Sequence, residues 1–224
     1  METKTNPTQL TENSNETKKT PANDLKKPKP EKDEKKHLID MKPLQCFQGT
    51  VKEWLSNKDF IYDGFILETE NEEIKIKFPP HSAKLIRTAV ENHPEISLKG
   101  VVHNSPEKVK TVHLINFQSE GNTVDIVPPA HPPVPDTMIR KEGKVTDYQH
   151  DSKNNICGYF INDTYLLKIP PHIAEKLKEQ MQIDVRVEFT GMAKSDKEGE
   201  VKVKDYIIIN TQTLAVNTNE YLIK

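Results

Sequence analysis

The side chains of this sequence best suited to chemistry are lysines placed close to aromatic rings. Lys75 and Lys77 alternate with apolar residues, and Trp54 and Tyr62 stand shortly before them. Aromatic rings can stack on unpaired bases, and lysines along a strand can follow a phosphate backbone. The same combination returns further along the chain, as Tyr159, Tyr165 and Lys168. These seven residues are the candidate binding residues of the sequence, and single-stranded nucleic acid is their first candidate ligand.

Signatures of catalysis and of metal binding are missing from the sequence. It has no nucleophile elbow, no phosphate-binding loop and no dinucleotide-binding glycine pattern. The two cysteines, Cys46 and Cys157, stand at non-equivalent places and fit a packing role. Five further histidines do not fall at metal-ligand spacing: His93, His103, His113, His131 and His150. We therefore expect a protein that is not an enzyme and that holds no metal ion and no cofactor.

The elements that must position the candidate residues come in two copies. The paired segments are 49–51 and 143–145, 63–66 and 157–160, and 76–83 and 167–174, followed by Gly100 and Gly191. The offset is 94 for the first two pairs and 91 for the last two. The decrease of the offset by three residues indicates a shorter turn between the second and third strands of copy two, as expected of duplicated units.

The most specific shared signal is a repeated Pro-Pro-His segment. It consists of Pro79, Pro80 and His81 in copy one, and of Pro170, Pro171 and His172 in copy two. Proline is tolerated where a helix begins, because the first amides of a helix have no partner within it. We interpret the six residues as a structural signature at the start of a helix.

Each copy predicts three strands, a helix and two more strands. The expected strands of copy one are 47–54, 61–67, 73–78, 95–102 and 110–117, with a helix over 82–91. Those of copy two are 143–148, 156–161, 165–169, 185–191 and 201–209, with a helix over 172–181. This is the element order of the OB-fold, a five-stranded Greek-key barrel. The predicted fold class is therefore all-β, with two tandem OB-fold-like barrels and one short helix in each.

The Phe/Ile-Pro-Pro-His segment resembles that of a group of small bacterial OB-fold proteins. The resemblance covers residues 46–127 and 140–216 and implies an OB-like barrel, but it implies no activity. Five prolines in the nine residues 127–135 favour an extended spacer, which we expect to keep the two barrels from sharing a core. The predicted organisation is a tail over 1–43, barrels over 44–127 and 140–216, a linker over 128–139 and a C-terminal tail over 217–224.

The first 43 residues predict a disordered tail of mixed charge. They hold ten Lys and eight Asp and Glu and no aromatic residue, and they cannot bury enough apolar surface to fold. Such a tail can keep a protein in solution or tether it to an anionic partner. No apolar leader and no apolar run of about 18 residues is present. We therefore expect a cytoplasmic protein that does not contact a membrane.

The balance of charge weakens the nucleic-acid hypothesis. The chain carries 32 Lys and Arg against 34 Asp and Glu, a net charge of -2. Proteins that bind nucleic acid are usually basic, because the release of counterions supplies much of their affinity. The alternative is a protein–protein interaction adaptor that uses the same barrels or the N-terminal tail.

Overall fold

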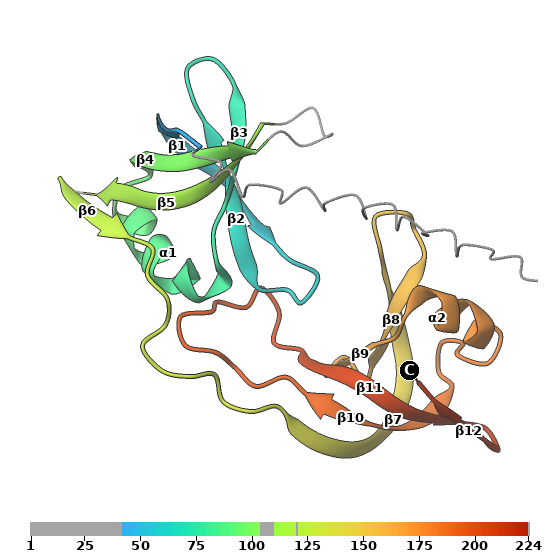
Figure 1. Cartoon of the computed structure of the whole chain (residues 1–224). Coiled ribbons are helices and arrows are strands. Elements are labelled where there is room, and N and C mark those ends of the chain that lie inside the picture. The colour runs from blue at the N-terminus through green and yellow to red at the C-terminus, as the bar shows by residue number, and fades with distance from the viewer. Residues whose placement is uncertain (1–41, 104–109, 120, 224) are drawn as a thin grey trace, which may run out of the picture. The chain divides into compact units, whose positions relative to one another are not determined.

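The chain folds into two β-barrels, shown in a computed structural model that describes residues 42–103, 110–119 and 121–223 (Figure 1). The expected disordered tail lies outside these residues apart from its last two positions. The first barrel contains β1 (Leu44–Ser56), β2 (Tyr62–Glu68), β3 (Glu73–Lys77), β4 (Glu95–His103), β5 (Thr111–Ser119) and β6 (Asn122–Asp125). A 3-10 turn, η1 (Pro80–Ser82), leads into α1 (Ala83–Asn92).

Strand pairing closes the first barrel into a ring. β1 pairs antiparallel with β2 and with β4, β2 pairs with β3, and β4 pairs with β5. A parallel pairing of β3 with β5 completes the ring, and β6 adds a hairpin to β5. Alternation in β3 buries Ile74 and Ile76 in the core and leaves Lys75 and Lys77 on the outer face. The buried side of α1 packs onto the same core through Ile86 and Val90.

The second barrel repeats this arrangement. It contains β7 (Thr137–His150), β8 (Ile156–Ile161), β9 (Tyr165–Lys168), α2 (Pro171–Leu177), β10 (Arg186–Ala193), β11 (Ile207–Val216) and β12 (Asn219–Leu222). A parallel pairing of β9 with β11 and an antiparallel pairing of β10 with β11 again close a five-stranded ring. The expected fold class, all-β with OB-like barrels and one short α-helix in each, is confirmed.

The two barrels match each other down to their irregularities. β1 shifts register after Val51, and β7 shifts register after Val145, its repeat counterpart. β4 and β10 shift register just before Gly100 and Gly191. A Cβ atom at either glycine would lie 2.5 Å from a carbonyl oxygen of the next strand, so that a larger residue would force the strands apart.

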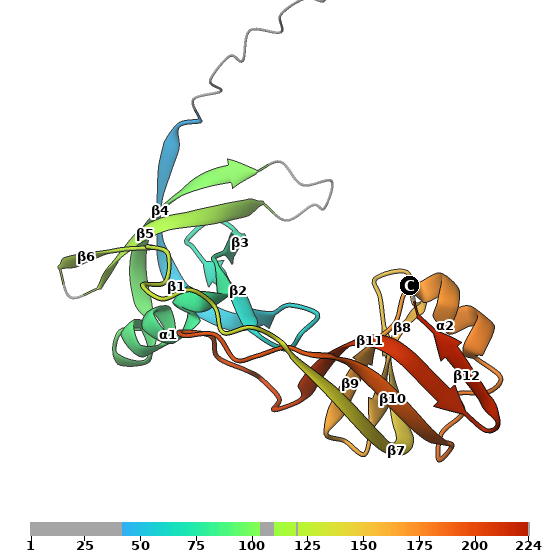
Figure 2. The ribbon, with the colours of Figure 1, turned by 60° about the horizontal axis from the view of Figure 1, so that its bottom comes forward.

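The last two strands of copy two differ from the sequence prediction. The expected strand 201–209 begins only at Ile207, and the expected C-terminal tail contains β12, which runs beside β11 (Figure 2). Val112 in β5 and Ile209 in β11 pair with equivalent residues of β3 and β9, so they are counterparts in the two barrels. Their residue numbers differ by 97. Because the offset at Gly100 and Gly191 is 91, the loop before β11 is six residues longer than the loop before β5.

Each barrel has its own core cluster, as expected, but side chains of the two barrels also meet in a small third cluster. Phe60, between β1 and β2, packs with Phe160, Leu166 and Ile208 of the second barrel. In the other direction, Val201 of the long loop packs on the core of the first barrel. Neither α-helix in the described part of the chain is long and apolar enough to cross a membrane.

Candidate binding grooves

The turn that joins the first two strands has the same conformation in both barrels. In the first barrel, the side-chain oxygen of Asn57 accepts hydrogen bonds from the amides of Asp59 (2.8 Å) and Ile61 (3.2 Å). In the second barrel, the carboxylate of Asp151 accepts the equivalent bonds from residues 153 and 155, at 2.8 and 2.9 Å. Side chains of Asn and Asp commonly fix turns in this way.

One position of the turn carries very different residues in the two copies. Phe60 has a φ of 58°, and its counterpart Asn154 has a φ of 62°. Asparagine tolerates this left-handed conformation, whereas a bulky residue there is an outlier. A phenylalanine at this position therefore needs compensating contacts, which the second barrel supplies.

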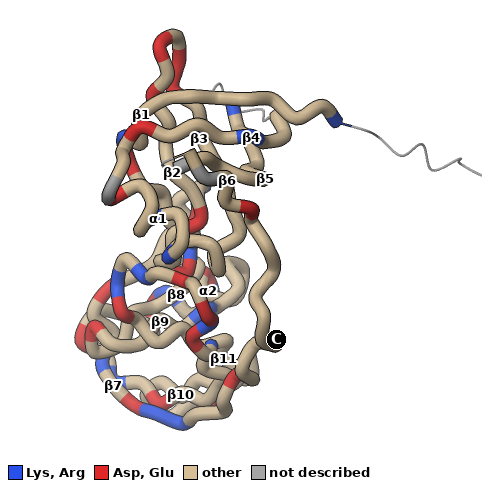
Figure 3. Tube along the Cα trace, turned by 90° about the vertical axis from the view of Figure 1, so that its left-hand side faces the viewer, with Lys and Arg blue, Asp and Glu red and all other residues tan. Residues whose placement is uncertain are grey.

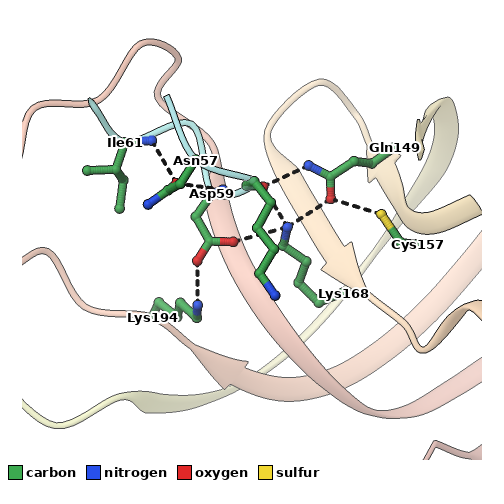
Figure 4. A network of polar contacts seen from close by, with 8 residues as sticks. Asn57, Asp59, Ile61, Gln149, Cys157, Lys168 and Lys194 are labelled. Carbon is green, nitrogen blue, oxygen red and sulfur yellow. Dashed lines mark hydrogen bonds and ion pairs between the residues drawn. The ribbon is translucent and has the colours of Figure 1, made fainter. Parts of the chain in front are cut away.

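The turn of the first barrel lies in a groove on the outer face of the second barrel (Figure 4). We call it the filled groove and define it by Cys157, Leu166, Lys168, Lys194, Ile208 and Asn210. Asp59 places its carboxylate between two lysines, with Oδ1 3.0 Å from Lys168 Nζ and Oδ2 2.5 Å from Lys194 Nζ. Lys168 also donates to the carbonyl oxygen of Lys58 (2.6 Å) and to Gln149 Oε1 (2.8 Å). Asp59 and Lys168 are thus each held by more than one partner.

Burial shapes the electrostatics of this ion pair. Only 12% of the Asp59 side chain and 16% of the Lys168 side chain are exposed. Burial works to raise the pKa of Asp59, but hydrogen bonds and charges of Lys194 and Lys168 outweigh it and hold that pKa below its ordinary value. Burial lowers the pKa of Lys168, although Asp59 opposes the shift.

Next to the ion pair, the filled groove has an apolar subsite for Phe60. The ring of Phe60 lies 6.0 Å from that of Phe160 and 5.3 Å from that of Tyr206, centroid to centroid. Leu166 and Ile208, which are buried, complete the cluster. The groove therefore binds a turn by two features, a carboxylate and the aromatic ring that follows it.

The long loop before β11 of the second barrel contacts the first barrel in turn. The amide of Tyr62 donates to the carbonyl oxygen of Val201 (3.0 Å), and the amide of Val203 donates to that of Phe60 (2.7 Å). The amide of Lys84 in α1 donates to the carbonyl oxygen of Gly199 (2.9 Å). The residues that distinguish the long loop from its shorter counterpart thus serve to hold the first barrel.

The first barrel has an open groove of about 740 Å³ at the equivalent place. We define it by Asp63, Lys75, Lys77, His103, Thr111 and His113. Lys77 pairs across the sheet with Gly64 as Lys168 pairs with Gly158, which makes the two lysines equivalent. The register of the fourth strand in each barrel similarly makes His103 the counterpart of Lys194. Lys77 and His103 thus take the places in the open groove that Lys168 and Lys194 take in the filled groove.

Two differences set the charge of the open groove. Asp63 stands where the filled groove has Cys157, and its Oδ1 lies 2.8 Å from Lys77 Nζ. His103 and His113 stack with ring centroids 4.2 Å apart. Burial lowers the pKa of His113, and the nearby charges of His103, Lys77 and Lys42 lower it further. The open groove thus holds lysines, stacked histidines and one carboxylate.

The contact between His103 and His113 follows from the register of β4 and β5. His103 pairs with Thr111, so His113 lies two residues further along the neighbouring strand on the same face. The sequence prediction concerned metal-ligand spacing and did not include this contact.

Four acidic residues of the first barrel, Glu68, Glu70, Glu72 and Glu73, lie at the turn between β2 and β3, where Figure 3 shows a concentration of acidic positions. Asp63 is outside this group and lines the open groove. Within that turn, Glu72 and Glu73 form ion pairs with Lys110 and Lys52. The net charge of the barrel therefore does not describe the charge of the groove.

Only two of the seven candidate binding residues, Lys75 and Lys77, line the open groove. Trp54 and Tyr62 instead lie beneath Arg87 of α1, whose guanidinium is 5.4 and 4.8 Å from their ring centroids. Trp54 also packs edge-on against Phe65 in the core. The aromatic rings and the lysines of the first barrel thus do not form one face.

The three candidates in the second barrel are engaged within the protein. Tyr159 is completely buried, its hydroxyl donates to the carbonyl oxygen of Ala174 (3.1 Å), and burial raises its pKa to about 12. Tyr165 is half-buried against Phe189, and Lys168 holds Asp59. A ring without exposed surface cannot stack on a base, so the expectation for Tyr159 is wrong.

The Pro-Pro-His segments lie where the helical segments begin. Pro79 precedes η1 and Pro170 precedes α2, each in an extended conformation. His81 contacts the carbonyl oxygen of Val127 through Nε2 (3.0 Å), and His172 is exposed. The second residue of each pair, Pro80 or Pro171, opens its helical segment.

Metal chemistry and comparisons with other proteins add no further assignment. Within residues 42–103, 110–119 and 121–223, no group of three or more His, Cys, Asp or Glu side chains could hold a metal ion. No protein-family model matches the chain, and a search of curated proteins finds no match.

Proposed function

We propose that the protein is a non-enzymatic adaptor that binds a segment of a partner protein in the open groove of its first barrel. One observation carries this proposal. The equivalent groove of the second barrel is occupied by polypeptide, the turn that contains Asp59 and Phe60. Because the two grooves share fold, register and cation positions, the filled groove is a guide to the kind of ligand that suits the open one.

The chemistry of the open groove favours an acidic ligand. Lys75 and Lys77 of β3 and His103 of β4 line the same space. Asp63 offsets part of their charge but uses only one direction of the Lys77 ammonium, which has three donors. A carboxylate of the partner can therefore share Lys77 with Asp63, since Lys168 in the filled groove donates two hydrogen bonds and also forms an ion pair with Asp59.

Single-stranded nucleic acid is the second candidate ligand, favoured by the two lysines and the stacked histidines of the open groove. The aromatic rings expected to stack on bases are not in this groove, and Phe78 at its margin is only 5% exposed. Base stacking supplies much of the affinity of OB barrels for single strands. A polypeptide ligand therefore fits the groove better.

The experiment that tests this proposal compares two fluorescent probes on the full-length chain. One is a cyclic peptide that contains Asn-Lys-Asp-Phe-Ile, the sequence of the occupying turn, and the other is a mixed-sequence single-stranded oligonucleotide. We expect the peptide to raise its anisotropy on binding and Lys77→Ala to weaken that binding about tenfold. Lys141→Ala, an exposed lysine of β7 outside both grooves, is the matched control.

The outcomes separate the two candidate ligands. Peptide binding that Lys77→Ala weakens and Lys141→Ala leaves unchanged supports the adaptor. Oligonucleotide binding that falls steeply with salt and is lost in Lys77→Ala, together with no peptide binding, overturns the adaptor in favour of nucleic acid. Binding of neither probe overturns both.

A further inference from the structure

Resting on the proposed function, we infer that the open groove selects a turn that carries a phosphorylated side chain. The phosphoryl group takes the place that the Asp59 carboxylate has in the filled groove, and its donors are Lys77, His103 and His113. The filled groove provides the template, and the exchange of Asn210 for His113 provides the change in specificity.

The three donors come from three strands and line one space. Lys77 is the last residue of β3, His103 is the last residue of β4, and His113 lies near the start of β5. Lys77 pairs directly with His113, and the ring centroids of the two histidines are 4.2 Å apart. Because His113 is exposed and His103 is half-buried, a ligand can reach both rings from solvent.

The third of these donors has no charged counterpart in the filled groove. There, Lys168 and Lys194 hold the two carboxylate oxygens of Asp59, and the remaining position carries Asn210, which pairs with Lys168 as His113 pairs with Lys77. An amide cannot take up a proton at neutral pH, whereas an imidazole can. The first barrel therefore has, at the third position, a group that can become a cation.

A phosphoryl group makes use of this third donor. A phosphorylated serine carries close to two negative charges at pH 7 and has three terminal oxygens, whereas an aspartate has one charge and two oxygens. Asp63, with Oδ1 2.8 Å from Lys77 Nζ, offsets the charge of that lysine. The histidines must therefore supply the charge that balances the ligand, and a dianion draws more of it from them than a monoanion does.

The charges around His113 predict how it responds to such a ligand. Within the described residues, the titratable or charged groups that face it are Lys75 and Lys77 on β3, His103 on β4, Asp63 on β2 and Lys42 before β1. Burial and the nearby cationic groups lower the pKa of His113, so that its ring is neutral at pH 7 when the groove is empty. A neighbouring dianion favours the protonated ring, so binding of a phosphorylated turn should take up protons at pH 7.

Calorimetry on the full-length chain tests this specificity with three cyclic peptides of equal length. They contain Asn-Lys-Ser-Phe-Ile, with phosphoserine, aspartate or unmodified serine at the third position. We expect the phosphoserine peptide to bind about tenfold more tightly than the aspartate peptide, because it adds a second charge and a third acceptor oxygen. The serine peptide should bind most weakly, because it has no anionic group.

A second readout is the number of protons taken up on binding, measured by repeating the calorimetry at pH 7 in two buffers of different ionisation enthalpy. The phosphoserine peptide should take up more protons than the aspartate peptide. This measurement needs only the wild-type chain, so it tests the inference even if a variant does not fold.

A variant that installs the residue of the filled groove sharpens the test. His113→Asn should reduce the preference for phosphoserine from about tenfold to about twofold and should lower the proton uptake, while the affinity for the aspartate peptide changes little. His172→Asn is the matched control, since His172 is an exposed histidine of α2 that lies outside both grooves. It should leave all three affinities unchanged.

Failure of this inference differs from failure of the proposed function. If the aspartate peptide binds as tightly as the phosphoserine peptide, with both weakened by Lys77→Ala, the phosphoryl specificity is wrong and the adaptor stands. A preference and a proton uptake that persist in His113→Asn would overturn the assignment of His113.

Two other phosphate sources would also overturn the inference. Inorganic phosphate that binds as tightly as the phosphoserine peptide would show that the groove does not recognise a turn. A mixed-sequence oligonucleotide that displaces this peptide at lower concentration would assign the groove to nucleic acid. If none of the three peptides binds, the adaptor and the specificity fail together.

Discussion

The turns at residues 57–61 and 151–155 are built alike and have opposite environments. Each is fixed by a side-chain oxygen at its first residue, and each passes through a left-handed residue. The first carries Asp59 and Phe60, which insert into the second barrel, whereas the second carries Lys153 and Asn154, which are exposed. The two turns thus have the same backbone conformation, and Asp59 and Phe60 are the residues by which the first turn binds the second barrel.

The grooves differ in a matching way. The filled groove surrounds its occupant with Leu166, Phe160 and Ile208, while the open groove places Lys75 and Thr111 at the same register. The two copies therefore share one fold, and among the described residues it is the face of the second barrel that joins the barrels.

The largest expected effect comes from removing the inserted ring. Phe60→Ala should lower the free energy of unfolding by about 3 kcal/mol, because a largely buried aromatic ring is lost from its cluster. Asn154→Ala is the matched control, since it introduces alanine at the same left-handed φ, and it should lower stability by about 1 kcal/mol or less. Urea unfolding of the two variants measures the difference, and equal losses would contradict the account.

Removing the inserted carboxylate should have the next largest effect. Asp59→Asn leaves Lys168 and Lys194 close together without their counter-charge, and we expect a loss of about 2 kcal/mol in unfolding free energy. Asp63→Asn breaks the more exposed pair with Lys77 and should change stability by less than about 1 kcal/mol. A larger loss from Asp63→Asn would reverse the proposed roles of the two carboxylates.

The same carboxylate predicts a dependence on acid. Because the folded-state pKa of Asp59 is lowered, its contribution to stability is complete above its ordinary pKa of about 4 and is lost as the pH falls through the lowered value. The unfolding free energy of wild type should therefore decline more steeply below pH 4 than that of Asp59→Asn. Parallel declines measured by urea unfolding at several pH values would argue against this ion pair.

The contact between the loop before β11 and the first barrel should contribute less to the free energy of unfolding than the inserted turn does. Val201→Ala removes two methyl groups from the side of the first core and should lower unfolding free energy by about 1 kcal/mol. Val203 lies in the same loop but is 44% exposed, so Val203→Ala is the control and should have almost no effect. Equal effects of the two variants would show that the loop does not hold the first barrel through Val201.

The smallest expected effect concerns affinity rather than stability. Asp63→Asn removes a carboxylate beside Lys77 in the open groove and should tighten binding of the cyclic Asn-Lys-Asp-Phe-Ile peptide about threefold. Cys157→Ser changes the equivalent residue of the filled groove and should leave that affinity unchanged. Calorimetry with both variants decides whether Asp63 opposes the ligand.

Strand alternation made the barrels and the outward direction of Lys75 and Lys77 predictable, since period-two patterning decides which face of a strand is buried. The same reasoning placed Lys168 on an outer face, which is right, but could not show that Asp59 covers it. That pairing depends on a turn more than 100 residues earlier in the chain, and no local pattern records it.

The segment around Val201 and Val203 shows a different limit of prediction from sequence, because its alternating pattern predicts a strand that does not form. It resembles a strand, and the sequence reading extended the fifth strand of copy two over it. In the structure the segment forms only an isolated bridge, between Lys202 and Ile61 of the first barrel. Val201 is partly buried by tertiary contact rather than by pairing in its own sheet, which periodicity alone cannot distinguish.

The most direct test of the central claim is to map the binding of the cyclic Asn-Lys-Asp-Phe-Ile peptide on the isotopically labelled full-length chain by NMR. The account predicts chemical-shift changes confined to β3, the end of β4 and the start of β5, and their disappearance in Lys77→Ala. Shift changes centred on another surface, or changes that persist in Lys77→Ala, would contradict the claim that the open groove is the counterpart of the filled one.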